Sequence, residues 1–268
     1  MTRGAWGHHT ITAALYLMAA LIGVLALALP FLQASQAGAS GDPILRAGET
    51  PLLATLLVSL CLAVLVVELQ GQAAGAKTVA ALGILVAATS TLRFIEVGIP
   101  GPAGFSPIFV PIILGGYVFG PRFGFLLGAL TLFVSAIMTA GVGPWLPYQM
   151  FTAGWLGLTA GWLPHPRRPG LELAMLLTFG FLWGFLYGGI MNLYTWPYLV
   201  GNAQTTWTPG TGAGNAMRQY AAYYVATSLV WDSAAAIGNV VLLAALGLPT
   251  VRALSRFRNR FHFQVVGS

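Results

Sequence analysis

The chain has 268 residues, of which 57% are hydrophobic and only 7% are charged, and its mean hydropathy is +0.79. Soluble domains carry about 25% charged residues, so this composition excludes an ordinary soluble fold and indicates an all-α integral membrane protein. The formal net charge is +6, but the basic residues stand in short clusters between apolar runs. Such clusters are typical of cytoplasmic membrane flanks, so no nucleic-acid partner is expected.

Eight apolar runs are candidates for transmembrane helices, because a bilayer core about 30 Å thick takes roughly 20 apolar residues per helix. They lie near residues 10–32, 51–69, 77–95, 106–119, 121–141, 148–164, 171–195 and 217–247. The fourth run is short and is separated from the fifth only by Gly120, Pro121 and Arg122, which predicts a tight hairpin. In the fifth run, Gly124 and Gly128 have the small-residue spacing that lets another helix approach closely.

The positions of Lys and Arg predict the orientation, because cationic loops stay on the cytoplasmic side. With both termini inside, nine of the 12 basic residues are cytoplasmic. These nine are Arg3, Lys77, Arg122, Arg167, Arg168, Arg252, Arg256, Arg258 and Arg260, while Arg46, Arg93 and Arg218 lie outside. We therefore expect a multi-pass protein of the plasma membrane with both termini in the cytoplasm.

The distribution of polar residues changes at Lys77 and predicts that the chain has three parts. Residues 1–76 contain two plain Leu/Ala/Val helices and a small-residue linker. Residues 77–250 carry almost all of the polar residues expected within the membrane, and residues 251–268 form a basic cytoplasmic tail. The predicted architecture is a six-helix substrate-binding core preceded by two extra N-terminal transmembrane helices.

Three ionisable residues fall inside or near predicted spans, where charges are costly and so indicate pairing or function. Asp232 stands about fifteen residues into the last predicted span. Arg93 and Glu96 are three apart near the outer end of the third span, on one helix face. Two interpretations stay open: an Arg93–Asp232 pair that joins two helices, or groups that line a cavity open to the outside and bind a polar solute.

Further polar and aromatic residues fall in the same outer half and complete the predicted substrate site. They are Trp145, Gln149, Asn192, Tyr194, Trp207 and Tyr224. Aromatic walls with a few polar groups suit a small organic ligand, although anchoring at the membrane interface is an equal alternative for Trp207. The inner half is nearly all Leu, Ala, Gly and Phe, which argues against a channel.

Signatures of catalysis and of metal binding are missing from the sequence. It contains no Walker A, HExxH or GxSxG motif, and its four histidines lie at irregular spacing on the predicted cytoplasmic edges. The single cysteine, Cys61, offers neither an internal disulfide nor a cysteine metal site. We expect no enzyme activity, no cofactor, no metal and no ATPase within the chain.

Three stretches carry a family resemblance, and GPW-x-P-x-QM is its most distinctive part. They are AKTVAALGILVAATSTLR (76–93), SPIFVPIILGGYVFGPRFGFLLGAL (106–130) and VGPWLPYQMFTAGWLGLTAGWL (142–163). Over about residues 77–250 the chain resembles a substrate-binding S component of an energy-coupling factor (ECF) vitamin transporter. The two N-terminal helices are extra to the six that are usual in that family.

The resemblance implies a prokaryotic plasma-membrane protein that captures a vitamin or related micronutrient from outside. It would then dock on a transmembrane coupling subunit, dedicated or shared, that is driven by two cytoplasmic ATPases. Members of the family dock through an Ala-xxx-Ala pattern on the first core helix, which Ala76 and Ala80 match. The substrate stays open, with a corrinoid or its precursor as one candidate. The alternative is a self-sufficient secondary transporter, which would show two related halves, and the sequence has no convincing internal repeat.

Overall fold

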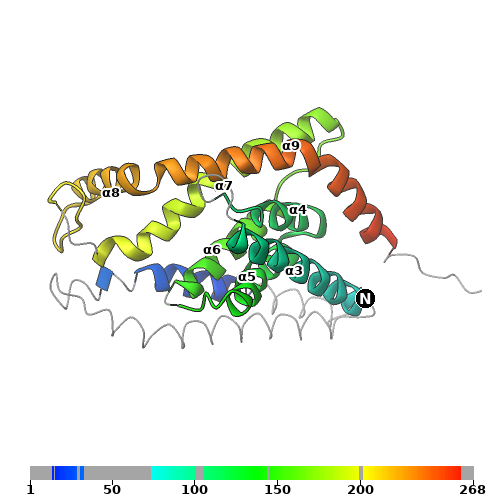
Figure 1. The fold of residues 1–268 in the computed structure, drawn as a ribbon, viewed down its shortest axis with the longest axis horizontal. Helices are drawn as coiled ribbons and strands as arrows, with labels where there is room; N and C mark the ends of the chain where they lie inside the picture. The colour runs from blue at the N-terminus through cyan, green and yellow to red at the C-terminus, as the bar shows by residue number, and fades with distance from the viewer. Residues whose placement is uncertain are drawn as a thin grey trace, which may run out of the picture.

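The described part of the protein is helical, with connecting loops and no strand (Figure 1). The computed structural model describes residues 14, 16–28, 31–32, 74–99, 105–143, 145–198 and 202–260. Its labelled elements are α3 (Ala74–Gly98), α4 (Phe109–Phe119), α5 (Pro121–Met138), α6 (Leu146–Ala160), α7 (Pro169–Thr195), η2 (Trp196–Tyr198), α8 (Ala213–Thr227) and α9 (Leu229–Arg260). A further apolar helix spans Tyr16–Ala28. The second predicted span, 51–69, lies outside the described residues.

Among the described residues, four helices are long and apolar enough to cross a membrane. They are Lys77–Gly98, Pro121–Met138, Pro169–Tyr198 and Leu229–Asn259. Phe109–Phe119 is apolar but shorter, as the sequence predicted for the fourth run. These helices agree with a multi-pass α-helical membrane protein, whereas the count of six core helices and two extra ones stays a prediction.

The predicted hairpin between α4 and α5 is confirmed, and it is built on glycine and proline. Gly120 has φ +98°, a left-handed conformation that favours glycine. Pro121 then occupies the first turn of α5, where its missing N–H costs nothing. The two helices therefore turn back on each other within a single residue.

The α4–α6 helices form the tightest part of the core because glycines let their backbones touch. A Cβ added at Gly124 would overlap the carbonyl oxygen of Gly157, and one added at Gly128 would overlap that of Ala153. Both of these α5 glycines face α6, as their spacing indicated. Around them the apolar side chains of Leu127 and Met150 are fully buried.

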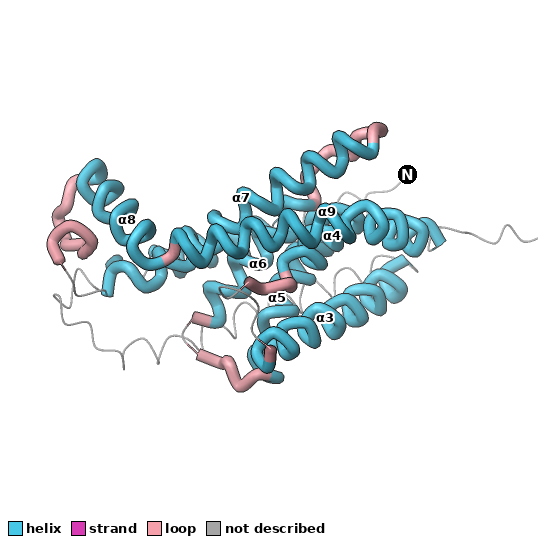
Figure 2. Tube along the Cα trace, turned by 45° about the horizontal axis from the view of Figure 1, so that its top comes forward, coloured by secondary structure: helices cyan, strands magenta, loops and turns pink. Residues whose placement is uncertain are grey.

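The last predicted span, 217–247, is wrong as a single helix. The chain instead forms α8 and α9, which are separated at Ser228 (φ −127°, ψ −24°). Polar side chains favour the break, because the Ser228 hydroxyl accepts a hydrogen bond from the Asn192 amide at 2.6 Å. Figure 2 shows α7 and α9 side by side, with α8 continuing beyond them. As a result Asp232 stands in the first turn of α9 rather than deep inside a span.

The C-terminal half of α9 continues past the end of the predicted span. The helix runs to Arg260 and contains Pro249, which removes one intrahelical hydrogen bond and bends a helix. In Figure 1 α9 changes direction toward its red end. The first ten residues of the predicted basic tail, 251–260, are therefore helical, and residues 261–268 lie outside the described part.

Candidate functional site

One group of predicted ligand residues joins α3 to the segment that enters α4. The Arg93 guanidinium lies 3.9 Å from the Glu96 carboxylate, and the other Glu96 oxygen accepts a hydrogen bond from Ser106 at 2.5 Å. The phenol of Tyr187, on α7, lies close enough to interact electrostatically with both charges. Its ring centroid is 4.6 Å from that of Phe109. These contacts bring the ion pair on α3 and the start of α4 close to Tyr187 of α7.

A second group lies against α7, where α8 meets α9. The Tyr224 hydroxyl donates to Asp232 Oδ2 at 2.7 Å, and the Tyr220 hydroxyl donates to the Gly189 carbonyl. Burial raises the pKa of both phenols, and for Tyr224 the Asp232 carboxylate adds to the effect. Both tyrosines in α8, a helix outside the four candidate spans, therefore stay protonated as hydrogen-bond donors.

A row of glycines on α7 makes the second group possible. Gly180, Gly184 and Gly188 are four residues apart, and all three face α9. A Cβ added at Gly188 would overlap the Asp232 carboxylate, and one added at Gly184 would overlap the backbone of Ala236. The α7 glycines thus admit a carboxylate directly against the helix backbone, a role that the sequence analysis missed although the four-residue spacing signals it.

The predicted pairing of Arg93 with Asp232 is not found in the described part of the chain. Arg93 contacts Glu96, three residues further along its own helix, and Asp232 accepts its hydrogen bond from Tyr224. The two predicted charges therefore belong to different groups, which approach α7 at the neighbouring residues Tyr187 and Gly188.

The remaining predicted ligand residues lie apart from these two groups. Tyr194 is buried and stacks on Tyr148 at 4.3 Å. Trp145 is exposed, and its indole N–H donates to the Gly141 carbonyl at 3.2 Å. Trp207 packs edge-on against Phe31, with 5.3 Å between the ring centroids, so the loop before α8 contacts the N-terminal part of the chain. Gln149 is half-buried on α6.

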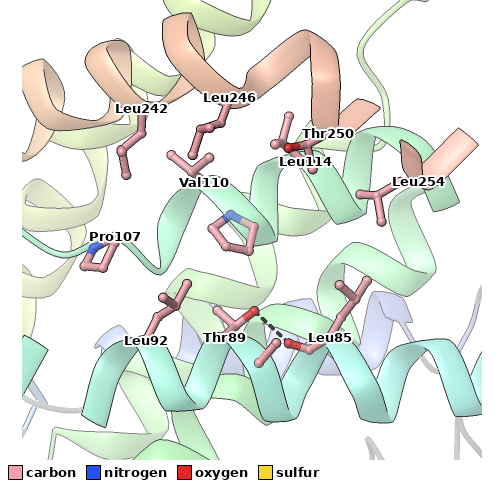
Figure 3. Close-up of a pocket in the computed structure, with 12 residues that line it drawn as sticks. Leu85, Thr89, Leu92, Pro107, Val110, Leu114, Leu242, Leu246, Thr250 and Leu254 are labelled. Atoms are coloured by element: carbon pink, nitrogen blue, oxygen red, sulfur yellow. Dashed lines mark hydrogen bonds between the residues drawn. The ribbon is translucent and has the colours of Figure 1, made fainter. Parts of the chain in front are cut away.

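Two cavities in the described part differ sharply in chemistry. An apolar groove of about 340 Å³ runs between α3 and α9 with α4 as its floor (Figure 3). A polar cavity of about 570 Å³ lies at the start of α8, where Arg218 is one of its lining residues. Neither cavity is lined by any of the nine predicted ligand residues. Among the described residues, no group of three or more His, Cys, Asp or Glu side chains is placed to hold a metal ion.

The sequence analysis also missed a polar contact at the opposite end of the helices. The Tyr117 hydroxyl donates to Glu172 at 2.8 Å, and its ring stacks on His165 at 4.2 Å. Arg258 donates to the Val118 carbonyl nearby. The signal was available, because each of these residues adjoins a loop or helix end that the predicted topology assigns to the same side.

The fold and the polar groups define a helical membrane protein with ionisable side chains between its helices. A comparison with models of protein families matches residues 77–247 to "ECF transporter, substrate-specific component". This match covers more than half of the chain, so the protein belongs to the family of ECF transporter substrate-specific components, as the resemblance predicted. Members of this family are transport proteins and not enzymes, and the ATPases are separate subunits. Searches of curated proteins and of solved structures gave no match.

Proposed function

We propose that the protein captures a vitamin or a related micronutrient from the outer side of the membrane and delivers it to a coupling subunit driven by two ATPases. The observation that supports this proposal is the family match, which starts at Lys77, where polar residues become frequent in the sequence. The chain itself supplies the binding step. The plasma membrane of a prokaryote is the proposed location, with both termini in the cytoplasm.

The ligand site is proposed between the helices that surround the C-terminal half of α7. The Arg93–Glu96 pair approaches α7 from α3, and Asp232 with Tyr224 approaches it from α9 and α8. A small solute there meets a guanidinium, two carboxylates and phenol hydroxyls, which together recognise polar groups on an organic ring. Asn192 belongs to the same region through Ser228. Trp145, Gln149, Tyr194 and Trp207 remain proposed contacts of the outer wall.

The coupling subunit is proposed to dock on the exposed face of α3. Ala80, Gly83 and Ala87 are exposed on this face, and a Cβ added at Gly83 would meet nothing within 4 Å. Small residues let a partner helix approach closely within a membrane, and Ala76 extends the row by one turn along α3. The apolar groove of Figure 3 meets a different face of α3, through Leu85 and Leu92, and is not part of this docking surface.

Docking and binding are separated by the substitution Ala80→Trp. The bulky ring blocks close approach, so vitamin uptake by cells that express the coupling subunit and ATPases is expected to be lost. Ligand affinity of the isolated chain is expected to stay unchanged, because Ala80 lies on an exposed face. Ala174→Trp, on an exposed position of α7, is the matched control and keeps uptake. Normal uptake with Ala80→Trp contradicts docking on this face.

The binding step is tested on the purified chain. Native mass spectrometry of the protein, extracted with its endogenous ligand, is expected to show one small molecule bound per chain. Proteoliposomes that contain only this chain distinguish a binding subunit from a secondary transporter, because a secondary transporter accumulates solute without the coupling subunit. Accumulation by the chain alone would replace the proposed function with that alternative.

A further inference from the structure

We infer that the polar cavity at the start of α8 binds the anionic group, a carboxylate or a phosphate, of a small soluble molecule. The inference rests on the proposed function, because it names the chemical class of solute that the outer face selects. The cavity has a volume of about 570 Å³, and its lining residues are Gln204, Gly210, Thr211, Gly212, Asn215, Arg218, Gln219 and Ala222. Most of these groups are hydrogen-bond donors, and none of the lining residues is acidic.

Arg218 sets the sign of the charge that the cavity accepts. Within the described part of the chain the Arg93–Glu96 contact is the one ion pair, so no described carboxylate lies at ion-pair distance from the Arg218 guanidinium. The other described arginine near this side, Arg93, has its own acidic neighbour. An arginine that faces a cavity without a counter-charge matches a carboxylate or a phosphate, which it binds through two parallel hydrogen bonds.

The start of α8 borders the same cavity, because Gly212 and Asn215, on either side of Ala213 and Gly214, both line it. Gly212 caps the helix with extended backbone (φ −61°, ψ 149°), offers no side-chain cap, and is followed by no acidic residue in the first turn. The N–H groups of Ala213 and Gly214 precede the intrahelical hydrogen bonds and carry the positive end of the helix dipole. Gly214 and Arg218 are four residues apart and so share one helix face. The cation and the helix terminus act on one anion.

Two buried polar atoms near the cavity have no hydrogen-bond partner. Gln219 lines the cavity, and its amide nitrogen donates to the Ala203 carbonyl at 3.0 Å, but its Oε1 is buried and unpaired. Thr206 Oγ1, in the loop that precedes α8, is also buried without a hydrogen-bond partner. Buried polar atoms nearly always have partners. A ligand hydroxyl beside the anionic group gives the Gln219 oxygen the donor that it lacks.

Inorganic phosphate is the probe for the anionic subsite. The full chain is purified in uncharged detergent, and its thermal unfolding is followed against phosphate concentration at constant ionic strength, since a ligand at free concentration L that binds only the folded state stabilises it by RT ln(1 + L/Kd). Arg218→Gln is expected to raise the dissociation constant obtained from this curve by about tenfold. The matched control, Arg252→Gln, removes an exposed arginine from the distant end of α9 and leaves the curve unchanged.

A second variant tests the helix terminus without touching a charge. Ala213→Pro removes one N–H at the first position of α8, where proline is compatible with a helix, and the extended Gly212 suits the residue that precedes a proline. The unfolding temperature without phosphate is expected to stay close to that of the original protein, while phosphate binding weakens by about threefold. Unchanged phosphate binding in both Arg218→Gln and Ala213→Pro overturns the inference, as does an equal loss with Arg252→Gln.

A phospholipid headgroup offers the same phosphate chemistry and is separated by a second arm. Nanodiscs of phosphatidylcholine are compared with nanodiscs that also contain phosphatidylglycerol. Stabilisation by phosphatidylglycerol that depends on Arg218, with none by free phosphate, assigns the cavity to lipid and overturns the soluble anion. Failure of this inference can be told apart from failure of the proposed function. If the anion site is absent, micronutrient capture remains intact. If a chain that captures no micronutrient still binds phosphate through Arg218, the proposed function is refuted and the anion site is not.

Discussion

The α5–α6 pair and the α7–α9 pair both approach closely through glycine, but they bring different groups to the contact. On α5, Gly124 and Gly128 press against backbone atoms of α6. On α7, the row of Gly180, Gly184 and Gly188 meets Asn239, Ala236 and Asp232 of α9 in turn. The first pair joins backbone to backbone at both glycines, whereas the second does so at Gly184 and admits polar side chains at Gly180 and Gly188.

Burial differs between the pairs in the same sense. In the most apolar stretch of α5, 61% of the residues are buried, against 22% in α7 and 28% in α9. Close packing of backbone against backbone makes the α4–α6 region the rigid part of the fold. The α7–α9 region is held by side-chain hydrogen bonds such as Tyr224–Asp232 and Asn192–Ser228, which can rearrange around a solute. We therefore expect the response to ligand to occur in α7–α9.

The largest effect is expected from Gly157→Ala. The new Cβ overlaps the Gly124 carbonyl oxygen, and both partners are backbone, so neither moves without separating α5 from α6. Overpacking of this kind costs about 1–3 kcal/mol or more. Thermal unfolding of the purified chain in detergent measures the loss.

Gly83→Ala is the matched control for that substitution. It adds the same methyl group to an exposed position of α3, where a Cβ meets nothing within 4 Å. Alanine favours a helix over glycine by about 0.5–1 kcal/mol, so this variant is expected to be neutral or slightly more stable. Equal losses from both substitutions contradict the view that α5 and α6 are joined by backbone contact.

A smaller loss of stability, but a larger loss of binding, is expected from Gly188→Ala. The new Cβ overlaps the carboxylate of Asp232, which is the free end of a side chain and turns away at a cost of about 1 kcal/mol. The displaced carboxylate no longer meets the Tyr224 hydroxyl or a ligand beside it. Ligand titration and thermal unfolding are measured on the same sample. A fall in stability as large as that of Gly157→Ala, with unchanged affinity, contradicts the proposed difference between the α5–α6 and α7–α9 contacts.

Much of the framework could be predicted from residue patterns that act locally. The Gly120–Pro121 hairpin and the spacing of Gly124 and Gly128 each depend on neighbours in the chain, and the structure confirms them. The family could be predicted from the stretches that begin at residue 76, since the family match begins at Lys77.

The rest depended on contacts between distant segments. The break at Ser228 forms where Asn192, 36 residues away, supplies a hydrogen bond, so an apolar run alone indicated one long helix. Arg93 had two acidic partners available in sequence terms, and the short distance along α3 to Glu96 decided between them. In the sequence Tyr117 is one aromatic residue of an apolar hairpin. Its contacts with Glu172 and His165, which are distant in the chain, could not be predicted from that pattern.

The smallest effect on stability is expected from Tyr224→Phe, which sharpens the comparison most. The change removes one hydroxyl and its bond to Asp232, at a cost of about 0.5–1.5 kcal/mol. Because the carboxylate loses a donor that orients it, ligand affinity is expected to fall by about three- to tenfold. Trp231→Phe is the control, since Trp231 adjoins Asp232 in sequence but is 57% exposed. Affinity that falls equally in both variants indicates a general disturbance of α9, whereas a fall confined to Tyr224→Phe ties solute binding to the carboxylate that the α7 glycines admit.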